Sequence, residues 1–240
     1  MLPYDDLGEV WHVFPKIVKG SAPCGIAKLK PMARFLAIFL LGSAALAQQY
    51  ELGADAGYGL YRNGSIYSAS GAVQAGIRNR FAAGLILGDN FSRYVSIEFN
   101  YLYHDGHPFL QGAGVKQDIQ GQSQTLTPEL LFHFRDRTNR WRPFLLGGVG
   151  AKDYVIAGPA PSPQPIPQIA SLTSNDIWKV VFSVGGGIKY RLADHILLRG
   201  EFVDYLTTFP RQQIVPAPNN TARGIFEQFT PLFAISYTFH

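Results

Sequence analysis

The sequence predicts an all-β fold, a single eight-stranded antiparallel up-and-down barrel. Three observations predict it: residues alternate between apolar and polar or small along most of the chain, long and short connections alternate between the segments, and the composition suits strands. Aromatic residues make up 13% of the chain, charged residues only 16%, and glycine is abundant with 25 residues. An average soluble domain has roughly 25% charged residues, so this composition excludes a disordered chain, a coiled coil and a charge-rich helical protein.

The predicted strands, in order, are 50–61, 80–89, 93–104, 124–134, 142–156, 178–191, 195–207 and 226–239. In the first, Leu52 and Leu60 fall on one face, while Glu51 and Asp55 fall on the other. The remaining strands repeat this period of two, which places successive side chains on opposite faces. Residues 68–77 fit either an extension of the second strand or a loop.

The connections alternate in length, which predicts two different ends of the barrel. The long ones are 62–78, 105–122, 157–177 and 208–225, and the short ones are 90–92, 135–140 and 193–194. Successive connections of an up-and-down barrel lie at opposite ends, so all long loops share one end. Transmembrane barrels with long external loops and short periplasmic turns have this layout. The segment GPAPSPQPIPQ in 157–177 favours an extended polyproline conformation.

The orientation of the two faces separates a membrane barrel from a soluble, lipocalin-like one. The polar face is rich in small residues, as a narrow eight-stranded interior requires. The last strand alternates aromatic residues and must pair with the first, because lipid tolerates no open sheet edge. Aromatic residues also gather near strand ends, as in interfacial girdles. We therefore expect these aromatic side chains to face lipid or its interface: Tyr101, Tyr103, Trp141, Trp178, Tyr190, Tyr237 and Phe239.

The same orientation predicts an interior network of charged side chains. Its members are Glu51, Asp55, Glu98, Glu129, Lys152, Lys189, Arg191, Arg199 and Glu201. An unpaired charge in a narrow interior is costly, so we expect a mutually paired ladder. Such a ladder would serve as a plug that fills the interior, or alternatively as a gate or narrow polar path.

Residues 32–47, MARFLAIFLLGSAALA, predict a secretory signal peptide. Arg34 precedes a short apolar run, and Ala45 and Ala47 form an A-x-A cleavage site. We expect cleavage before Gln48, a barrel domain over 48–240, and an over-called N-terminal extension over 1–31. The single cysteine, Cys24, would then be absent from the mature chain, which excludes a disulfide framework.

The predicted barrel resembles the OmpA-like outer membrane protein beta-barrel family. The resemblance rests on YELGADAGYGLY, YVSIEFNYLYHDG, RPFLLGGVGAKDY, FSVGGGIKYRLADHILLRGEFVDY and PLFAISYTF, in this order, and covers 48–240. It implies a monomer in the bacterial outer membrane whose partners are outer-membrane lipids and, during assembly, the barrel-insertion machinery. It also implies a structural or loop-mediated interaction role, or narrow passage of water or small ions. Two departures are that no peptidoglycan-binding domain follows the barrel, and that His240 follows the last aromatic residue.

The sequence gives less support to a nucleic-acid-binding protein, to an enzyme or to a soluble ligand-binding barrel. The 21 basic residues are scattered, so no nucleic-acid interface is predicted. A lipid A-modifying barrel enzyme, an acyl hydrolase or transferase, is the alternative, with His104, Asp105 and His107 as candidates. It would need a serine next to a histidine at the lipid face, whereas Ser123 lies across a long loop. We therefore predict no catalytic residue, no metal site and no cofactor. His133 is expected to be an ordinary lumen or rim residue, and a secreted soluble ligand-binding barrel is the third interpretation.

Overall fold

The computed structural model describes residues 49–68, 71–112, 114–164, 166–220 and 225–239. The predicted N-terminal extension and signal peptide lie outside the described residues. None of the described residues belongs to a helix long and apolar enough to cross a membrane.

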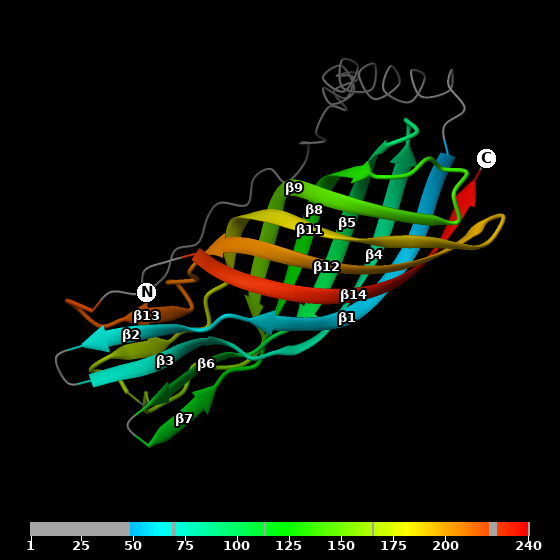
Figure 1. Ribbon diagram of the computed structural model, residues 1–240. Helices are drawn as coiled ribbons and strands as arrows, with labels where there is room; N and C mark the ends of the chain where they lie inside the picture. The colour runs from blue at the N-terminus through cyan, green and yellow to red at the C-terminus, as the bar shows by residue number, and fades with distance from the viewer. Residues whose placement is uncertain (1–48, 69–70, 113, 165, 221–224, 240) are drawn as a thin grey trace, which may run out of the picture. The chain divides into compact units, whose positions relative to one another are not determined.

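Eight long strands close into an antiparallel barrel, which confirms the predicted fold (Figure 1). They are β1 (Gln49–Tyr61), β4 (Arg80–Asn90), β5 (Val95–Asp105), β8 (Gly121–His133), β9 (Trp141–Ile156), β11 (Ile177–Ala193), β12 (Ile196–Thr208) and β14 (Ile225–Phe239). The last strand pairs with the first, in a register that sets Tyr50 opposite Phe239. Each of the eight predicted strands is present, with ends that differ by a few residues.

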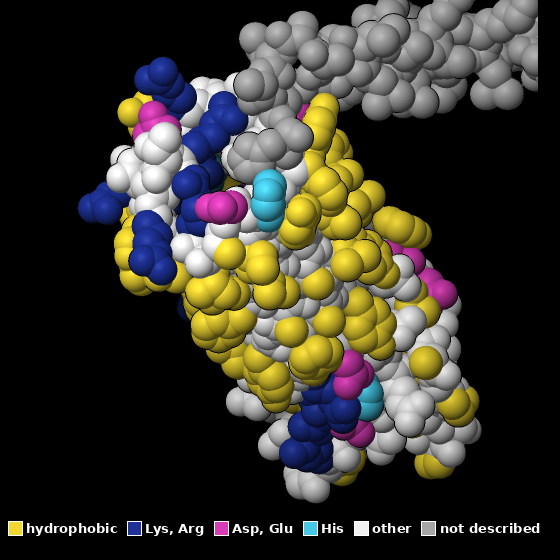
Figure 2. All heavy atoms as spheres, turned by 90° about the vertical axis from the view of Figure 1, so that its right-hand side faces the viewer, with side chains coloured by type: hydrophobic (Ala, Val, Ile, Leu, Met, Phe, Trp, Pro, Cys, Tyr) yellow, Lys and Arg dark blue, Asp and Glu magenta, His cyan; other side chains and the backbone are white. Residues whose placement is uncertain are grey.

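Alternation along the strands separates an apolar outside from a polar inside. In β1, Leu52 is 51% exposed, whereas its neighbour Glu51 is fully buried. The other strands do the same, and the exposed apolar side chains form a continuous band around the barrel. Figure 2 shows one face of the barrel, where apolar side chains lie between two ends at which charged side chains gather. A barrel whose outside is apolar and whose inside is charged reverses the soluble arrangement.

The long connections are not simple loops, which corrects the sequence prediction. Four short strands build a second sheet in the order β2-β3-β6-β7. They are β2 (Gly64–Ser68), β3 (Gly71–Ile77), β6 (Pro108–Gly112) and β7 (Val115–Asp118). Residues 71–77, which the sequence left ambiguous, thus belong to neither a loop nor the barrel. A third, two-stranded sheet pairs β10 (Ala170–Leu172) with β13 (Ile214–Pro216).

An apolar cluster holds these short strands together. Ile66, Val73, Leu110, Leu172 and Ile214 are all buried in it. Tyr61, Tyr154 and Phe226, from the ends of barrel strands, belong to the same cluster. The cluster therefore continues the barrel beyond the rim that carries the long connections. We call the two short-strand sheets and this cluster the external cap.

Candidate functional site

The barrel interior contains a connected ion network. Lys189 Nζ on β11 lies 2.6 Å from Glu51 Oε2 on β1 and 2.5 Å from Glu98 Oε1 on β5. Arg199 on β12 binds the second carboxylate oxygen of Glu98 and also binds Glu201. All five side chains are buried, so four strands from around the barrel wall are joined through its centre.

A glycine makes room for the two acids that share Lys189. Gly88 on β4 pairs with Glu51 on one side and with Glu98 on the other. A Cβ atom at Gly88 would lie 3.1 Å from Glu98 Cγ and 3.4 Å from Glu51 Cβ. The missing side chain thus leaves space for both carboxylates to reach one ammonium group.

The other four predicted members form no ion pair with any described residue. Asp55 is buried without a cationic partner, and Glu129 accepts a hydrogen bond from Thr127 Oγ1 at 3.1 Å. Arg191 donates a hydrogen bond to the carbonyl oxygen of Arg137. The expectation of a ladder that pairs all nine charges is therefore wrong for these four.

Lys152 shows that two side chains on the inner face of the barrel can still lie at different heights along it. Its strand pairs with β11 so that Arg142 lies opposite Lys189 and Lys152 lies opposite Lys179. At the rise of a β-strand, about 3.3 Å per residue, Lys152 lies about 33 Å along the strand from the level of Lys189. Its ammonium group instead lies 5.5 Å from the centre of the Tyr61 ring and 5.1 Å from that of Tyr154.

A second polar cluster surrounds Lys152 just below the external cap. Gln228 accepts a hydrogen bond from Lys152, and its amide nitrogen contacts His104 Nε2. The Tyr154 hydroxyl lies 3.0 Å from Thr207 Oγ1. These side chains close the upper interior with hydrogen bonds and aromatic rings.

The candidates for catalysis or metal binding are placed differently from the sequence expectation. Ser123 is not remote from His104: it lies directly opposite in the β5–β8 pair, and both side chains are buried inside the barrel. His107 Nε2 lies 3.4 Å from Asp105 Oδ1, and Arg80 pairs with the other oxygen of this carboxylate, Oδ2, at 2.9 Å. Within the described ranges, no group of His, Cys, Asp and Glu side chains could hold a metal ion.

His133 lies in the lumen near the opposite end. Its side chain is buried, and its Nε2 atom lies 2.9 Å from Ser96 Oγ. The ring of Phe144 is 5.7 Å away, centre to centre. His133 is therefore packed between a hydroxyl and an aromatic ring.

Apolar side chains fill the interior between the polar layers. Leu102, Leu131, Phe144, Val203 and Tyr205 are buried members of one cluster. The Arg199 guanidinium lies 4.7 Å from the centre of the Phe144 ring, so the apolar layer and the ion network touch. The ion network, this apolar cluster and the Lys152 cluster thus all lie inside the barrel.

The predicted lipid-facing aromatic residues lie on the outside or at its rims. Trp141, Trp178, Tyr101, Tyr237 and Phe239 are exposed. Tyr103 and Tyr190 are partly covered. The Tyr103 hydroxyl donates to Gln122 Oε1 at 2.9 Å, and the Tyr190 ring lies 4.6 Å from that of Trp141.

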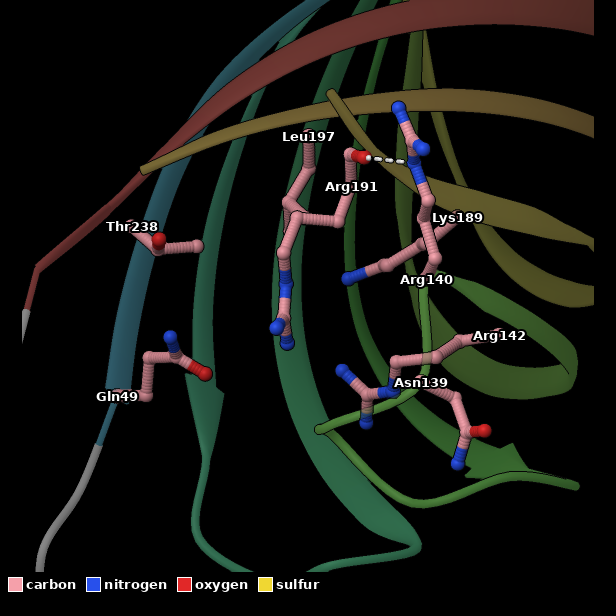
Figure 3. Close-up of a pocket in the computed structure, with 8 residues that line it drawn as sticks. All are labelled: Gln49, Asn139, Arg140, Arg142, Lys189, Arg191, Leu197 and Thr238. Atoms are coloured by element: carbon pink, nitrogen blue, oxygen red, sulfur yellow. Dashed lines mark hydrogen bonds between the residues drawn. The ribbon is translucent and has the colours of Figure 1, made fainter. Parts of the chain in front are cut away.

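A small pocket opens at the end of the barrel that carries the short turns (Figure 3). Its volume is about 10 Å³, which is room for about one water molecule. It is lined by Gln49, Asn139, Arg140, Arg142, Lys189, Arg191, Leu197 and Thr238. Arg142 was not among the inward-facing residues predicted from the sequence. The period of two could have found it, because Arg142 and Lys152 are an even number of residues apart in one strand and therefore share a face.

Comparison with known proteins gives a family and a set of similar folds. The family model "Outer membrane protein beta-barrel domain" matches residues 33–222. No curated protein matches the sequence.

Three solved structures are among those to which the chain is similar. Neisserial surface protein A is 10% identical, with a TM-score of 0.47, over 79% of this chain and 97% of that one. The outer membrane protein AlkL is 17% identical, with a TM-score of 0.47, over 79% and 90%. The N-terminal β-barrel domain of Pseudomonas aeruginosa OprF is 10% identical, with a TM-score of 0.43, over 79% and 97%.

Proposed function

Because the chain belongs to the outer membrane protein beta-barrel family, we propose that it is a closed barrel of the bacterial outer membrane that acts through its external cap. Its role on this proposal is structural or interactive, and the cap presents the surface that a partner contacts. Passage through the interior is limited to water or small ions. The observation that carries the proposal is the apolar cluster that joins the long connections into an ordered cap.

The packing of the interior supports a closed barrel. The ion network ties β1, β5, β11 and β12 together across the centre, and apolar layers adjoin it. An eight-stranded barrel has an interior just wide enough to be filled by side chains. Opening a path would require the buried ion pairs to separate, which leaves charges without partners.

The form of the cap supports an interaction surface. Its four-stranded sheet is open, and the outer strands β2 and β7 each pair on one side only among the described strands. Tyr67 on β2 is 70% exposed, whereas Ile66 beside it is buried in the cluster. An ordered edge with exposed side chains is a surface that another chain can join or cover.

Planar-bilayer recording of the purified protein tests the closed barrel. We expect no large, stable conductance steps, because the described side chains fill the lumen. Regular steps of the size that a water-filled porin gives would contradict the proposal.

Exchange of part of the cap tests its interactive role. A variant in which residues 64–77 are replaced by a Gly-Ser linker removes β2 and β3 and leaves the barrel strands intact. Heat-modifiable gel migration verifies that the barrel still folds. Cells that lack the protein are complemented with either form, and their binding to surfaces and to other cells is compared. We expect only the wild type to restore binding; equal restoration by both forms would refute a role for the cap.

We further propose that the barrel does not modify lipid A. A barrel deacylase needs its serine and histidine at the lipid face, whereas Ser123 and His104 point inward. Incubation of the folded protein with lipid A, followed by mass spectrometry, tests this. Loss or transfer of an acyl chain would overturn it.

Export and assembly complete the proposal. Cleavage of the segment 32–47 before Gln48 delivers the mature chain to the periplasm, and the barrel-insertion machinery then places it in the membrane as a monomer. N-terminal sequencing of the mature protein tests the cleavage site.

A further inference from the structure

The pocket at the short-turn end is built almost entirely from hydrogen-bond donors. Four of its eight lining residues are arginine or lysine, and none is acidic. Asn139 and Gln49 add amide groups, and Thr238 adds a hydroxyl. Figure 3 shows the guanidinium groups of Arg142 and Arg191 directed into the same space, with Gln49 on its other side.

Arg142 is the unusual member, because it is buried without an acidic partner. Its exposed fraction is 5%, and its Nε and Nη2 atoms have no hydrogen-bond acceptor among the described residues. Thr238 Oγ1, also in the lining, has none either. The charge of Glu51 attracts Arg142, but the ion pair that Glu51 forms is with Lys189. A buried guanidinium with unused donors is costly unless an anion accepts from it.

The charged side chains that line the pocket are all positive. They are Arg140, Arg142, Lys189 and Arg191. Lys189 is paired with Glu51 and Glu98, whereas Arg142 and Arg191 form no ion pair with any described residue. The buried acids Asp55 and Glu129 also face the interior without an ion pair in the described part of the chain, but they do not line the pocket.

We propose that this mouth is a binding site for a phosphate group, held by Arg142 and Arg191. Planar guanidinium groups bind phosphate oxygens through paired, charge-assisted hydrogen bonds. The Thr238 hydroxyl is placed to donate a further bond. The pocket itself has room for about one water molecule, so the phosphate group would dock across its mouth, and a larger ligand body would remain in the periplasm. The group belongs either to free inorganic phosphate or to a phosphate ester such as a phospholipid headgroup.

Arg140 provides a matched control, because it lines the same pocket but is engaged elsewhere. Its guanidinium carbon lies 5.0 Å from the centre of the Tyr190 ring, and its Nε donates to the Arg191 carbonyl oxygen at 3.4 Å. An Arg140→Gln variant removes the same charge from the same rim without removing the buried donors.

Isothermal titration calorimetry with inorganic phosphate tests the site. The protein is purified in an uncharged detergent and titrated in phosphate-free buffer. We expect saturable binding by the wild type, at least about tenfold weaker binding by Arg142→Gln, and a change below about twofold for Arg140→Gln. Heat-modifiable migration verifies that each variant is folded, and Arg191→Gln replaces Arg142→Gln if the latter does not fold.

Three results would overturn the proposal. They are the absence of binding in the millimolar range, equal binding by wild type and Arg142→Gln, and equal losses in Arg142→Gln and Arg140→Gln, which would indicate a diffuse charge effect. A parallel titration with glycerol 3-phosphate identifies the source. Tighter binding of the ester assigns the site to a lipid headgroup, and tighter binding of the inorganic ion assigns it to free phosphate.

Discussion

At the scale of single residues, Glu98 is the centre of the buried ion network. Among the described residues, it is the one carboxylate that binds both Lys189 and Arg199. Its neutralisation would leave two buried cations with only Glu51 and Glu201 as partners. Removal of one partner of a buried pair is costly because the other charge stays buried.

We therefore expect Glu98→Gln to lower the free energy of unfolding by about 3–5 kcal/mol. Urea unfolding in lipid vesicles, followed by tryptophan fluorescence, measures it. The matched control is Arg62→Gln, which breaks an ion pair with Glu227 in which the Arg62 side chain is 73% exposed. An exposed pair contributes about 0–1 kcal/mol, so the control should change little. If both variants lost a similar free energy of unfolding, the buried network would contribute no more to stability than an exposed ion pair does.

At the scale of elements, two prolines interrupt the strand pairing, and glycines lie beside the interruptions. The β8–β9 ladder stops at the pair Leu126–Ala151 and resumes at Glu129–Gly148, across Pro128, which has no N–H to donate. A Cβ atom at Gly150 would lie 2.0 Å from the Leu126 carbonyl oxygen. The β1–β14 ladder shows the same arrangement with Pro231 and Gly57. Backbone crowding at these points thus requires glycine.

We expect Gly150→Ala to destabilise the barrel by about 1–3 kcal/mol, because the new methyl group must displace backbone atoms of β8. Gly147→Ala is the control in the same strand, since its Cβ would meet only the Ser183 carbonyl oxygen, at an ordinary 3.9 Å. The same urea titration compares the two. A Gly147→Ala loss as large as that of Gly150→Ala would argue against backbone crowding as the reason for glycine.

At the scale of the whole molecule, the orientation of the barrel wall determines what the protein can do. Apolar side chains face lipid, so every polar group of the interior must find its partner inside the barrel or at its mouths. The ion network and the Lys152 cluster meet this requirement, whereas Arg142 is left with unused donors at one mouth. The cap completes the closure at the end with the long connections.

We expect Leu85→Arg to lower the free energy of unfolding by about 2–4 kcal/mol in lipid vesicles. Leu85 is 57% exposed and lies in the middle of β4, where an arginine would meet acyl chains. Tyr67→Arg is the control, since Tyr67 is 70% exposed but lies on the cap. Tolerance of Leu85→Arg at the level of the control would contradict a lipid-facing wall.

Much of the barrel followed from the sequence. Alternation in β1, β5 and β14 gave the face of each residue correctly, because a period of two is a local property of extended backbone. The alternation of long and short connections gave the up-and-down order. Residues 68–77 could not be assigned, because β2, β3 and β6 are held together by apolar contacts with segments far along the chain, such as Leu172 and Ile214.

The sequence by itself therefore determined the fold class, the eight barrel strands and which side chains point inward. Only the tertiary structure decided which inward charges meet: Glu98 reaches Lys189 and Arg199, Lys152 reaches none of the acids, and Arg142 is left with unused donors. The physical reason is that alternation along a strand determines only whether a side chain points inward or outward. Two inward charges can pair only if they also lie at the same height along the barrel axis. That height depends on the register between strands and on their tilt around the closed barrel.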